Sequence, residues 1–466
     1  MADRLLQLYD YFVPGYRDGT AKTSEGIPLL TPELLEKIRK ERSTDPQGTL
    51  ERARRAIHGD LTSEDVDRLI RHLDQAFKDP EGAIRDALAK GMALPSRFKF
   101  AGFEDSDAYK FEPDSKKFSD DDWTGFGLNC GTAILKRWFT GNTAFRWHTS
   151  YGSRFRYDLP GNASIALFSD FGTGLAHSRY IAKFITAGKP DLAIHLGDVY
   201  YAGRPAEVAS FYDKPLASLV ATCELWSIPG NHDYYSGGAP FFKGLDARRN
   251  GAGGCRHRQE GSYFCLDSPS FRIIGIDGEY HSGTRYDNDD LKRWLAQSIA
   301  EAKAAGRTVI LMSSDEPYSY DSKSAETLLH DVTADLPPDA IDLWFWGNTH
   351  YCAIFKPSDR LRSKFYGSCI GHGGYQYKTL DHESDAGEVA QILWAEREPR
   401  FPRWTGVRPD MGNNGFCVMR LDDGKRSLTL DYIDWTNAPR ATVEFVTVEG
   451  RLVVTEPQQH PRPECR

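Results

Sequence analysis

Residues 225–233 read Leu225-Trp226-Ser227-Ile228-Pro229-Gly230-Asn231-His232-Asp233. The first four residues form a short apolar run, which is typical of a buried strand. The last four are mostly polar, so we expect them in the loop that follows the strand. An amide oxygen such as that of Asn231 suits a hard or borderline metal ion, and His232 offers a proton donor or a cation. Because four residues recur by chance, the value of this motif depends on the residues at the ends of the other apolar runs.

Five further apolar runs also end at polar residues. They are Ile165–Phe168 before Asp170, Leu192–Leu196 before Asp198, Phe271–Ile276 before Asp277, Val309–Met312 before Asp315, and Leu343–Trp346 before His350. Nearly continuous apolar strands are buried on both faces, so they are typical of the sheet core of an α/β protein. Ligands in such sheets collect at the carboxyl ends of the strands. We therefore expect an α/β fold in which six strand ends bring polar side chains together.

The composition of the chain limits its class and its partners. A chain of 466 residues is too long for one simple core and suggests two or more domains. The formal net charge of -8 gives no reason to expect nucleic-acid binding. No apolar run approaches the roughly 20 residues of a membrane helix. The N-terminus shows no signal peptide and the eight cysteines form no Cys-x-x-Cys pair, so we expect a cytoplasmic protein with free thiols and no membrane partner. No pattern indicates an oligomeric state.

Helix signals and composition divide the chain into segments. Thr31-Pro32 and Thr62 are helix start signals, and apolar residues follow each of them at helical spacing. The predicted segments are a mainly helical N-terminal domain (1–100), a connecting segment that covers the next domain (101–160), the α/β domain (161–440), and a C-terminal strand and tail (441–466).

Four polar motifs occur in order, each after a predicted strand. They are Asp170-Phe171-Gly172, Gly197-Asp198-Val199-Tyr200-Tyr201, Gly230-Asn231-His232-Asp233, and Gly347-Asn348-Thr349-His350. This order resembles that of the calcineurin-like metallophosphoesterases, over roughly residues 160–435. Within that group the chain is most similar to the purple acid phosphatase branch, which has Gly in place of His in the first motif and a Tyr three residues after the second Asp. Here these are Gly172 and Tyr201. The resemblance implies a four-layer α/β/β/α sandwich.

The resemblance also implies a role for each matching residue. It gives a first metal ion, expected to be iron, the ligands Asp170, Asp198, Tyr201 and His350. Asp198 would bridge to a second ion, of Mn, Mg or Zn if that site is occupied, and Asn231 would also bind this ion. His232 would lie beside the substrate as a proton donor or transition-state stabiliser. Two metal ions activate a water and hold the phosphoryl oxygens during attack, so the implied activity is hydrolysis of a small phosphate mono- or diester.

Two imidazoles that the group places at the second metal are missing. Where the group has a ligand His, often within Ser-His-His-x-Pro, this chain has Ser313-Ser314-Asp315-Glu316-Pro317, and Asn348 replaces the first His of the last motif. Three hypotheses are open. Asp315 and Asn348 could substitute as oxygen ligands of a harder second site. The enzyme could instead work with one tight metal and a weak or substrate-recruited second one. Alternatively, the domain no longer hydrolyses phosphate esters and serves as a ligand-binding or scaffold module.

Further side chains near the motifs are candidates for substrate binding. His177 follows the first motif, and Arg204 follows the second. His372 lies in Gly371-His372-Gly373-Gly374, where small residues let the backbone approach a pocket. His195 lies inside an apolar run and is predicted to be a core residue, as are Trp344 and Trp346.

Overall fold

The computed structural model describes residues 141–151, 154–247, 259–280, 285–320, 326–380, 389–400 and 411–460, with a few residues between 40 and 137. The predicted helical domain over 1–100 therefore lies almost entirely outside the described residues. The chain divides into two compact units. The larger comprises Lys110–Ser115, Ala144–Tyr234 and Gly238–Arg466, and it contains both sheets and the candidate site described below.

One sheet contains the three strands that precede Asp170, Asp198 and Asn231. These strands are parallel to one another: β2 (Ser164–Phe168), β3 (Leu192–His195) and β4 (Glu224–Ser227). On the other side of β2 the sheet continues with antiparallel strands from the C-terminal part of the chain: β12 (Gly415–Asp422), β13 (Ser427–Asp434), β14 (Pro439–Val448), β15 (Arg451–Val454) and β16 (Gln458–Gln459).

The second sheet contains the other three predicted strands and is mixed. Its order is β1 (Arg156–Asp158), β5 (Phe264–Asp267), β6 (Phe271–Gly275), β7 (Thr308–Met312), β8 (Leu343–Trp346), β10 (Tyr366–Ile370), β9 (Cys352–Phe355) and β11 (Ile392–Ala395). All six strands expected from the apolar runs are present. They are shared equally between the two sheets, with β6, β7 and β8 parallel here.

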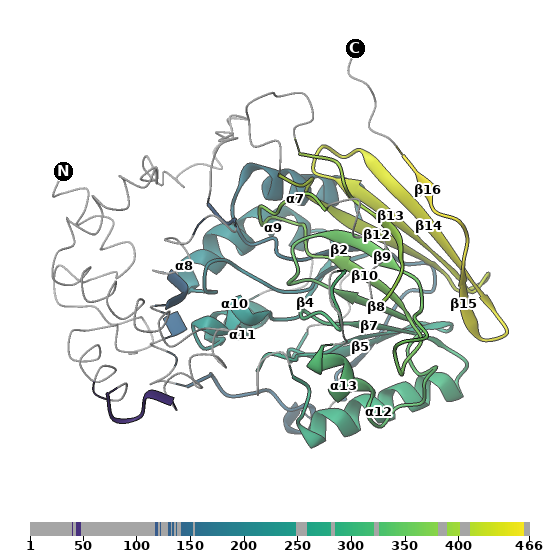
Figure 1. The fold of residues 1–466 in the computed structure, drawn as a ribbon, viewed down its shortest axis with the longest axis horizontal. Helices are drawn as coiled ribbons and strands as arrows, with labels where there is room; N and C mark the ends of the chain where they lie inside the picture. Colours follow the sequence, from purple (N-terminus) through teal and green to yellow (C-terminus); the bar gives the residue numbers. More distant parts are fainter. Residues whose placement is uncertain are drawn as a thin grey trace, which may run out of the picture. The chain divides into compact units, whose positions relative to one another are not determined.

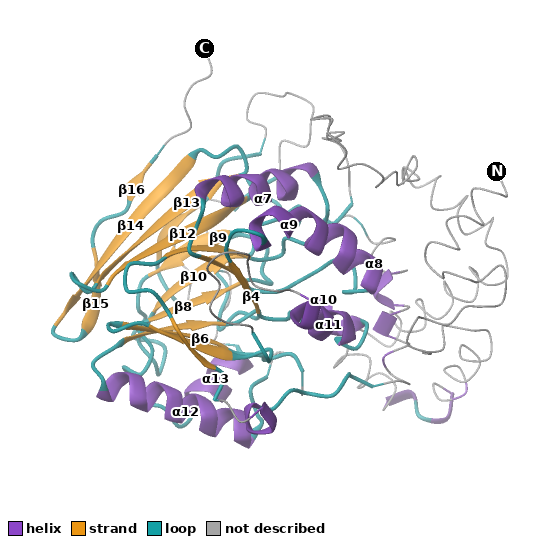
Figure 2. Ribbon diagram, turned by 180° about the vertical axis from the view of Figure 1, so that it is seen from behind, coloured by secondary structure: helices purple, strands orange, loops and turns teal. Residues whose placement is uncertain are grey.

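Helices cover the outer face of each sheet, which gives four layers (Figures 1 and 2). Figure 2 shows α7 (Ala176–Gly188) and α9 (Lys214–Val220) over the first sheet, and α12 (Asp289–Ala304) and α13 (Thr327–Thr333) over the second. The buried Ile181 and Ile185 of α7 pack on the sheet residues Ala166 and Phe168. The remaining helical segments are η1 (His148–Tyr151), α8 (Pro205–Glu207), η2 (Val208–Asp213), α10 (Asn231–Tyr235) and α11 (Ala239–Ala247). This arrangement confirms the predicted α/β/β/α sandwich.

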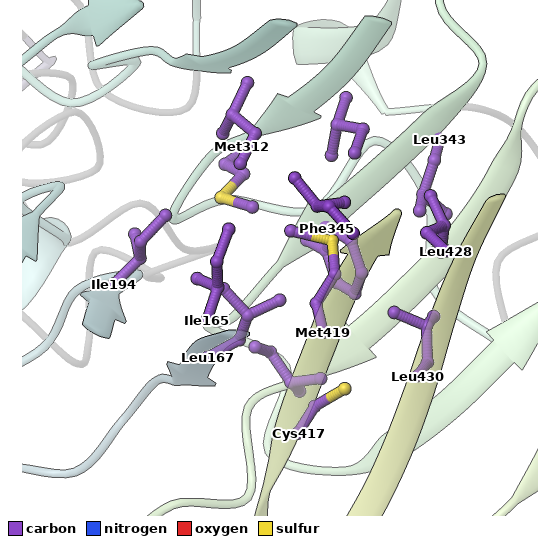
Figure 3. Packing of buried hydrophobic residues seen from close by; sticks show 14 of the residues in the cluster. Ile165, Leu167, Ile194, Met312, Leu343, Phe345, Cys417, Met419, Leu428 and Leu430 are labelled. Carbon is purple, nitrogen blue, oxygen red and sulfur yellow. The ribbon is translucent and has the colours of Figure 1, made fainter. Parts of the chain in front are cut away.

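The main hydrophobic core lies between the two sheets (Figure 3). Ile165, Leu167 and Ile194 of the first sheet meet Met312 and Phe345 of the second. Each fully buried aliphatic side chain contributes about 1.5–3 kcal/mol relative to an exposed one. His195, Trp344 and Trp346 are buried, as predicted for core residues.

Two further features bear on the class of protein. Among the described residues, no helix is both long and apolar enough to cross a membrane. The six described cysteines all carry free thiols, and each of them is buried.

Candidate metal centre

Three residues of the candidate site follow strands in a left-handed backbone conformation. The φ angles are +54° for Asp170, +75° for Asp198 and +58° for Asn348. Asp and Asn tolerate this region better than other residues with a Cβ, although it still costs free energy. Such positions recur at functional sites, where the surrounding structure holds them. The sharp turns here end β2, β3 and β8 and leave the polar side chains at the sheet edges.

Three side chains, one from each of these three loops, converge on the hydroxyl of Tyr200. Its oxygen lies 2.6 Å from Asp170 Oδ1, 2.9 Å from His350 Nε2 and 3.4 Å from Asp198 Oδ2. His350 Nε2 is also 3.4 Å from Asp170 Oδ1. Asp170, Asp198 and Tyr200 are buried, whereas the imidazole of His350 is 23% exposed. The site is thus a buried group of oxygens with one nitrogen nearer to solvent.

The pKa values of Asp170, Asp198 and Tyr200 depend on the charges of their neighbours. Burial raises the pKa of Asp198 well above its usual range, and the neighbouring charges of Asp170 and Asp233 add to this effect. Burial alone would raise the pKa of Asp170, but the hydrogen bond and charge of His350 lower it overall. Burial also raises the pKa of Tyr200, reinforced by Asp170 and Asp198. A cation among these oxygens would reverse the upward shifts, because it favours the charged form of each group.

The tyrosine in this group is not the one that the sequence indicated. Tyr201 was the predicted ligand, yet the hydroxyl beside Asp170 and His350 belongs to Tyr200. Tyr201 meets the site through its backbone, where its carbonyl oxygen lies 2.6 Å from Nδ1 of His232. The phenol beside Asp170 and His350 therefore belongs to Tyr200, one residue before the predicted Tyr201.

The Gly230–Asp233 motif joins the loops that follow β3 and β4. The carboxylate of Asp233 accepts hydrogen bonds from the backbone N–H of Asp198, at 3.0 Å, and of Gly230, at 2.9 Å. The N–H of His232 donates to Asp198 Oδ1 at 3.0 Å and to the side-chain oxygen of Asn231 at 2.9 Å. Asp233 had no predicted role, although it ends the motif. Asn231 to Asp233 form the start of α10 and not the predicted loop, and the Asp233 carboxylate links this helix to the loop after β3.

His232 is held beside the phenol of Tyr200. The two ring centroids are 4.3 Å apart. Nδ1 lies 2.6 Å from the carbonyl oxygen of Tyr201, so this nitrogen carries the proton and donates it. Proton exchange with a substrate would therefore use Nε2. The predicted role of His232 beside the substrate stays a prediction.

Comparison with known families assigns the part of the chain that carries this geometry. The family model of the calcineurin-like phosphoesterases matches residues 163–352. This part of the chain is a calcineurin-like phosphoesterase domain. The match includes every strand from β2 to β8, the start of β9, and the site residues from Asp170 to His350.

Two solved structures are similar to the chain over part of their length. The structure of purple acid phosphatase PPD1, isolated from yellow lupin (Lupinus luteus) seeds, is 14% identical with a TM-score of 0.42, and the match covers 60% of this chain. It covers 53% of the lupin chain, so this chain spans about half of that protein. GAP50, the anchor in the inner membrane complex of Plasmodium, is 12% identical with a TM-score of 0.44, and the match covers 65% of this chain and 90% of that one. No curated protein sequence matches the chain.

The phosphoesterase domain has altered side chains where the sequence predicted a second metal. The amide nitrogen of Asn348 donates to Glu316 Oε2 at 2.8 Å, and its backbone N–H donates to Asp170 Oδ2 at 3.0 Å. Burial raises the pKa of Glu316 to about 7, with a further contribution from Asp315. A Cβ added to Gly230 would lie 2.7 Å from Ser314 Oγ and 2.2 Å from Asp198 Oδ1. Ser314, which had no predicted role, thus lies beside Asp198.

Asp315, the predicted oxygen ligand, lies against a different part of the domain. Its carboxylate would be 3.4 Å from a Cβ on Gly278, and the side chain of Leu328 is equally close to that point. Gly278 follows β6, and Leu328 belongs to α13. Of these two neighbours in the loop after β7, Ser314 lies next to the Asp198 carboxylate and Asp315 lies next to Gly278.

The three predicted substrate contacts differ in their surroundings. His177 and His372 are both buried, at 3% exposure. His177 Nε2 lies 2.7 Å from the carbonyl oxygen of Gly374, and burial lowers the pKa of His177 well below its usual value. Burial also lowers the pKa of His372 to about 4. Arg204 is half-buried at the start of α8. His177 thus connects α7 to the Gly371–Gly374 segment, and substrate contact stays a prediction for all three residues.

One further residue at the site had no signal in the sequence. Tyr375 stacks on His350, with ring centroids 3.5 Å apart and an interplanar angle of 18°. Its backbone N–H donates to the carbonyl oxygen of Asp170 at 3.0 Å. The glycines before it allow this approach, because a Cβ on Gly374 would lie 2.4 Å from the carbonyl oxygen of Phe171. The Gly371–Gly374 segment therefore packs against the Asp170 loop.

The residues around Tyr200 fit one metal ion. Ligands at about 2.1 Å from an ion and at right angles to each other lie about 3 Å apart, and the separations of 2.6–3.4 Å around the Tyr200 hydroxyl match this value. Two carboxylates, a phenol and an imidazole suit iron, zinc or manganese. Counting only imidazoles, thiols and carboxylates, the described residues contain no group of three or more that could hold a metal ion. The phenol of Tyr200 is thus an essential member of this set.

Proposed function

We propose that this chain hydrolyses small phosphate esters at a metal site formed by Asp170, Asp198, Tyr200 and His350. The observation that supports the proposal is the convergence of these four side chains on one point beside His232. A bound metal ion would lower the pKa of a coordinated water and so supply a hydroxide nucleophile near neutral pH. The membership of residues 163–352 in the calcineurin-like phosphoesterases favours this chemistry.

The residues of the chain divide the remaining tasks. Asp170 and Asp198 supply the negative charge that binds a cation, and Asp233 holds the loops that carry Asp198 and His232. The Nδ1–H of His232 donates to the Tyr201 carbonyl, which leaves Nε2 free to face the substrate, and in the protonated imidazolium Nε2 donates its proton to a phosphoryl or leaving-group oxygen. A donor aimed at developing charge is worth about 2.7–4 kcal/mol of transition-state stabilisation.

We further propose that the domain belongs to the purple acid phosphatase-like branch, with iron at this site. The supporting residue is Gly172, which forms a β-bridge with Val199. A Cβ at residue 172 would lie only 2.6 Å from Val199 Cα, so the histidine of other branches does not fit in this backbone. A phenolate ligand then supplies the donor that this histidine would provide.

The proposal is tested with the metal-reconstituted full chain and two chromogenic substrates, p-nitrophenyl phosphate and bis(p-nitrophenyl) phosphate. We expect hydrolysis with iron, manganese or zinc, and an Asp198→Asn variant should lose at least about 100-fold in kcat/KM. Asp339→Asn, at an exposed position away from the site, is the matched control. Failure of every metal to support hydrolysis, or full activity of Asp198→Asn, would refute the proposed function.

The alternative is a phosphoesterase domain that binds a ligand or partner without turnover. The observation that favours it is the loss of both second-site imidazoles, with Asn348 paired to Glu316. Binding of orthovanadate or inorganic phosphate to a metal-loaded chain that hydrolyses neither substrate would support this alternative.

A further inference from the structure

We infer that this phosphoesterase domain holds one metal ion and not a pair. The inference rests on the proposed function for the identity of that ion's ligands, but it makes a separate claim about the neighbouring position. Four side chains could contribute to a second site, and the surroundings of each argue against that role: Ser314, Asn348, Asp315 and Asn231.

Ser314 stands where the loop after β7 faces Asp198. Its hydroxyl would be 2.5 Å from a Cβ on Gly197 and 2.7 Å from one on Gly230, so it fills the space between the loops that carry Asp198 and Asn231. No described residue accepts or donates a hydrogen bond to this hydroxyl. A neutral hydroxyl is a poor ligand for zinc, iron or manganese compared with an imidazole, so it would hold a water at most.

Asn348 is engaged on two sides. Its backbone N–H donates to Asp170, and its side-chain nitrogen donates to Glu316. The left-handed φ of +58° also explains why an asparagine is suitable at this turn. The Glu316 carboxylate thus holds the Asn348 side chain toward the loop after β7. Asn348 links this loop to the loop that carries Asp170.

The remaining candidates are Asp315 and Asn231. The buried Asp315 carboxylate lies by Gly278, which follows β6, and near Leu328 of α13. The amide oxygen of Asn231 accepts the N–H of His232 at 2.9 Å. Of the residues predicted to hold a second ion, only Asp198 and the amide oxygen of Asn231 therefore remain next to each other, which is fewer than the four ligands of a typical protein zinc site.

The metal content of the purified full chain tests this inference. We would saturate the chain with Zn²⁺, Mn²⁺ or Fe²⁺, remove unbound ions, and count ions per chain by elemental analysis, with and without inorganic phosphate. One ion per chain under all conditions is the expected result, whether or not the protein hydrolyses phosphate esters. Two ions per chain, including a second one that appears only with phosphate, would overturn the inference while leaving the proposed function standing. No bound ion would overturn both.

Three variants test which residues determine the number of bound ions. Asp315→Asn should leave the count at one, because this carboxylate does not contribute, and a loss of metal would contradict the inference. Asp170→Asn is the matched acidic variant that should lower the affinity for the single ion. A Ser314→His/Asn348→His double variant restores both imidazoles and should raise the count to two. If this folded variant still binds one ion, the two substitutions are not the reason, and the inference as stated is wrong.

Discussion

The phenol that lies beside Asp170 and His350 belongs to Tyr200, the residue next to the predicted ligand Tyr201. The Asp198–Tyr201 segment was predicted to supply a phenol, and the structure places a phenol there. Tyr200 and Tyr201 are consecutive residues of a turn, and it is the hydroxyl of Tyr200 that lies beside Asp170 and His350. The sequence offers two adjacent tyrosines and no signal that separates them.

Replacing each tyrosine in turn separates the two assignments. Tyr200→Phe should reduce the affinity for the bound metal about 10- to 100-fold, because it removes a ligand while keeping the ring contact with His232. If the ion is ferric, the same change should abolish the visible absorption of a phenolate complex. Tyr201→Phe is the control and should retain both properties, since the backbone of Tyr201, and not its hydroxyl, contacts His232. The reverse result would restore Tyr201 as the ligand.

The burial of His177 and His372 could not be predicted from a sequence motif. His177 was predicted to contact substrate because it follows Asp170 closely, yet it is buried against Gly374. Burial depends on α7 and the Gly371–Gly374 segment, which are far apart in sequence. The unpaired charge of an imidazolium would be costly in such a place, so His177 is neutral in the folded protein.

This neutrality predicts a specific dependence of stability on pH. The pKa of His177 is lowered in the folded state, so below about pH 6.5 the unfolded chain binds a proton that the folded chain does not. The His177 contribution to the free energy of unfolding is therefore intact above pH 6.5 and falls by about 1.4 kcal/mol per pH unit below it. His177→Gln should be about 1–2 kcal/mol less stable than the natural protein at pH 7.5, and this gap should shrink at pH 5.5. Urea unfolding of the metal-free proteins measures both; a gap that widens in acid would contradict the assignment.

At the scale of secondary structure, the strand ends were the most predictable feature. Apolar runs with polar ends indicated all six strands, because strands buried on both faces need continuous hydrophobic residues. The turns after β2 and β3 carry Asp170 and Asp198, as the motifs indicated. The packing of the Gly371–Gly374 segment was not predicted from the sequence. This segment packs on the backbone of the Asp170 loop, a contact between chain segments that no local pattern reveals.

The close packing of that glycine segment gives an element-level prediction. A Cβ on Gly374 would lie 2.4 Å from the carbonyl oxygen of Phe171, so Gly374→Ala must displace the Asp170 loop or the segment itself. We expect a loss of about 1–3 kcal/mol in the free energy of unfolding and weaker metal binding. Gly188→Ala, at the end of α7 with no atom within 4 Å of the new Cβ, is the matched control and should change neither. An unchanged metal affinity in Gly374→Ala would show that the loop tolerates the displacement.

At the scale of the molecule, the apolar runs indicated the sheet class, and the division into two sheets followed only from the family resemblance. Each sheet takes three of the predicted strands, and the pairing that joins β2 to β12 links residues about 250 positions apart. β12 pairs with β13 on one side and with β2 on the other. The pairing with β2 was not predicted, because strand pairing over such a distance leaves no local signature. The predicted N-terminal domain lies outside the described residues, so its role stays a hypothesis.

This long-range pairing predicts that the stability of the phosphoesterase domain depends on strands outside its family match. Leu430 of β13 is fully buried in the core between the sheets, in the same cluster as Ile165 and Phe345 (Figure 3). Leu430→Ala should cost about 2–5 kcal/mol, because it removes buried methyl groups and leaves a cavity between the sheets. Val448→Ala, on β14 of the same sheet but 50% exposed, should change stability by less than about 0.5 kcal/mol. Urea unfolding followed by tryptophan fluorescence measures both, since Trp226 and Trp344 report on the two sheets from within the matched residues. If Leu430→Ala left this transition in place, the C-terminal strands would be an independent addition and not part of the core that holds the metal site.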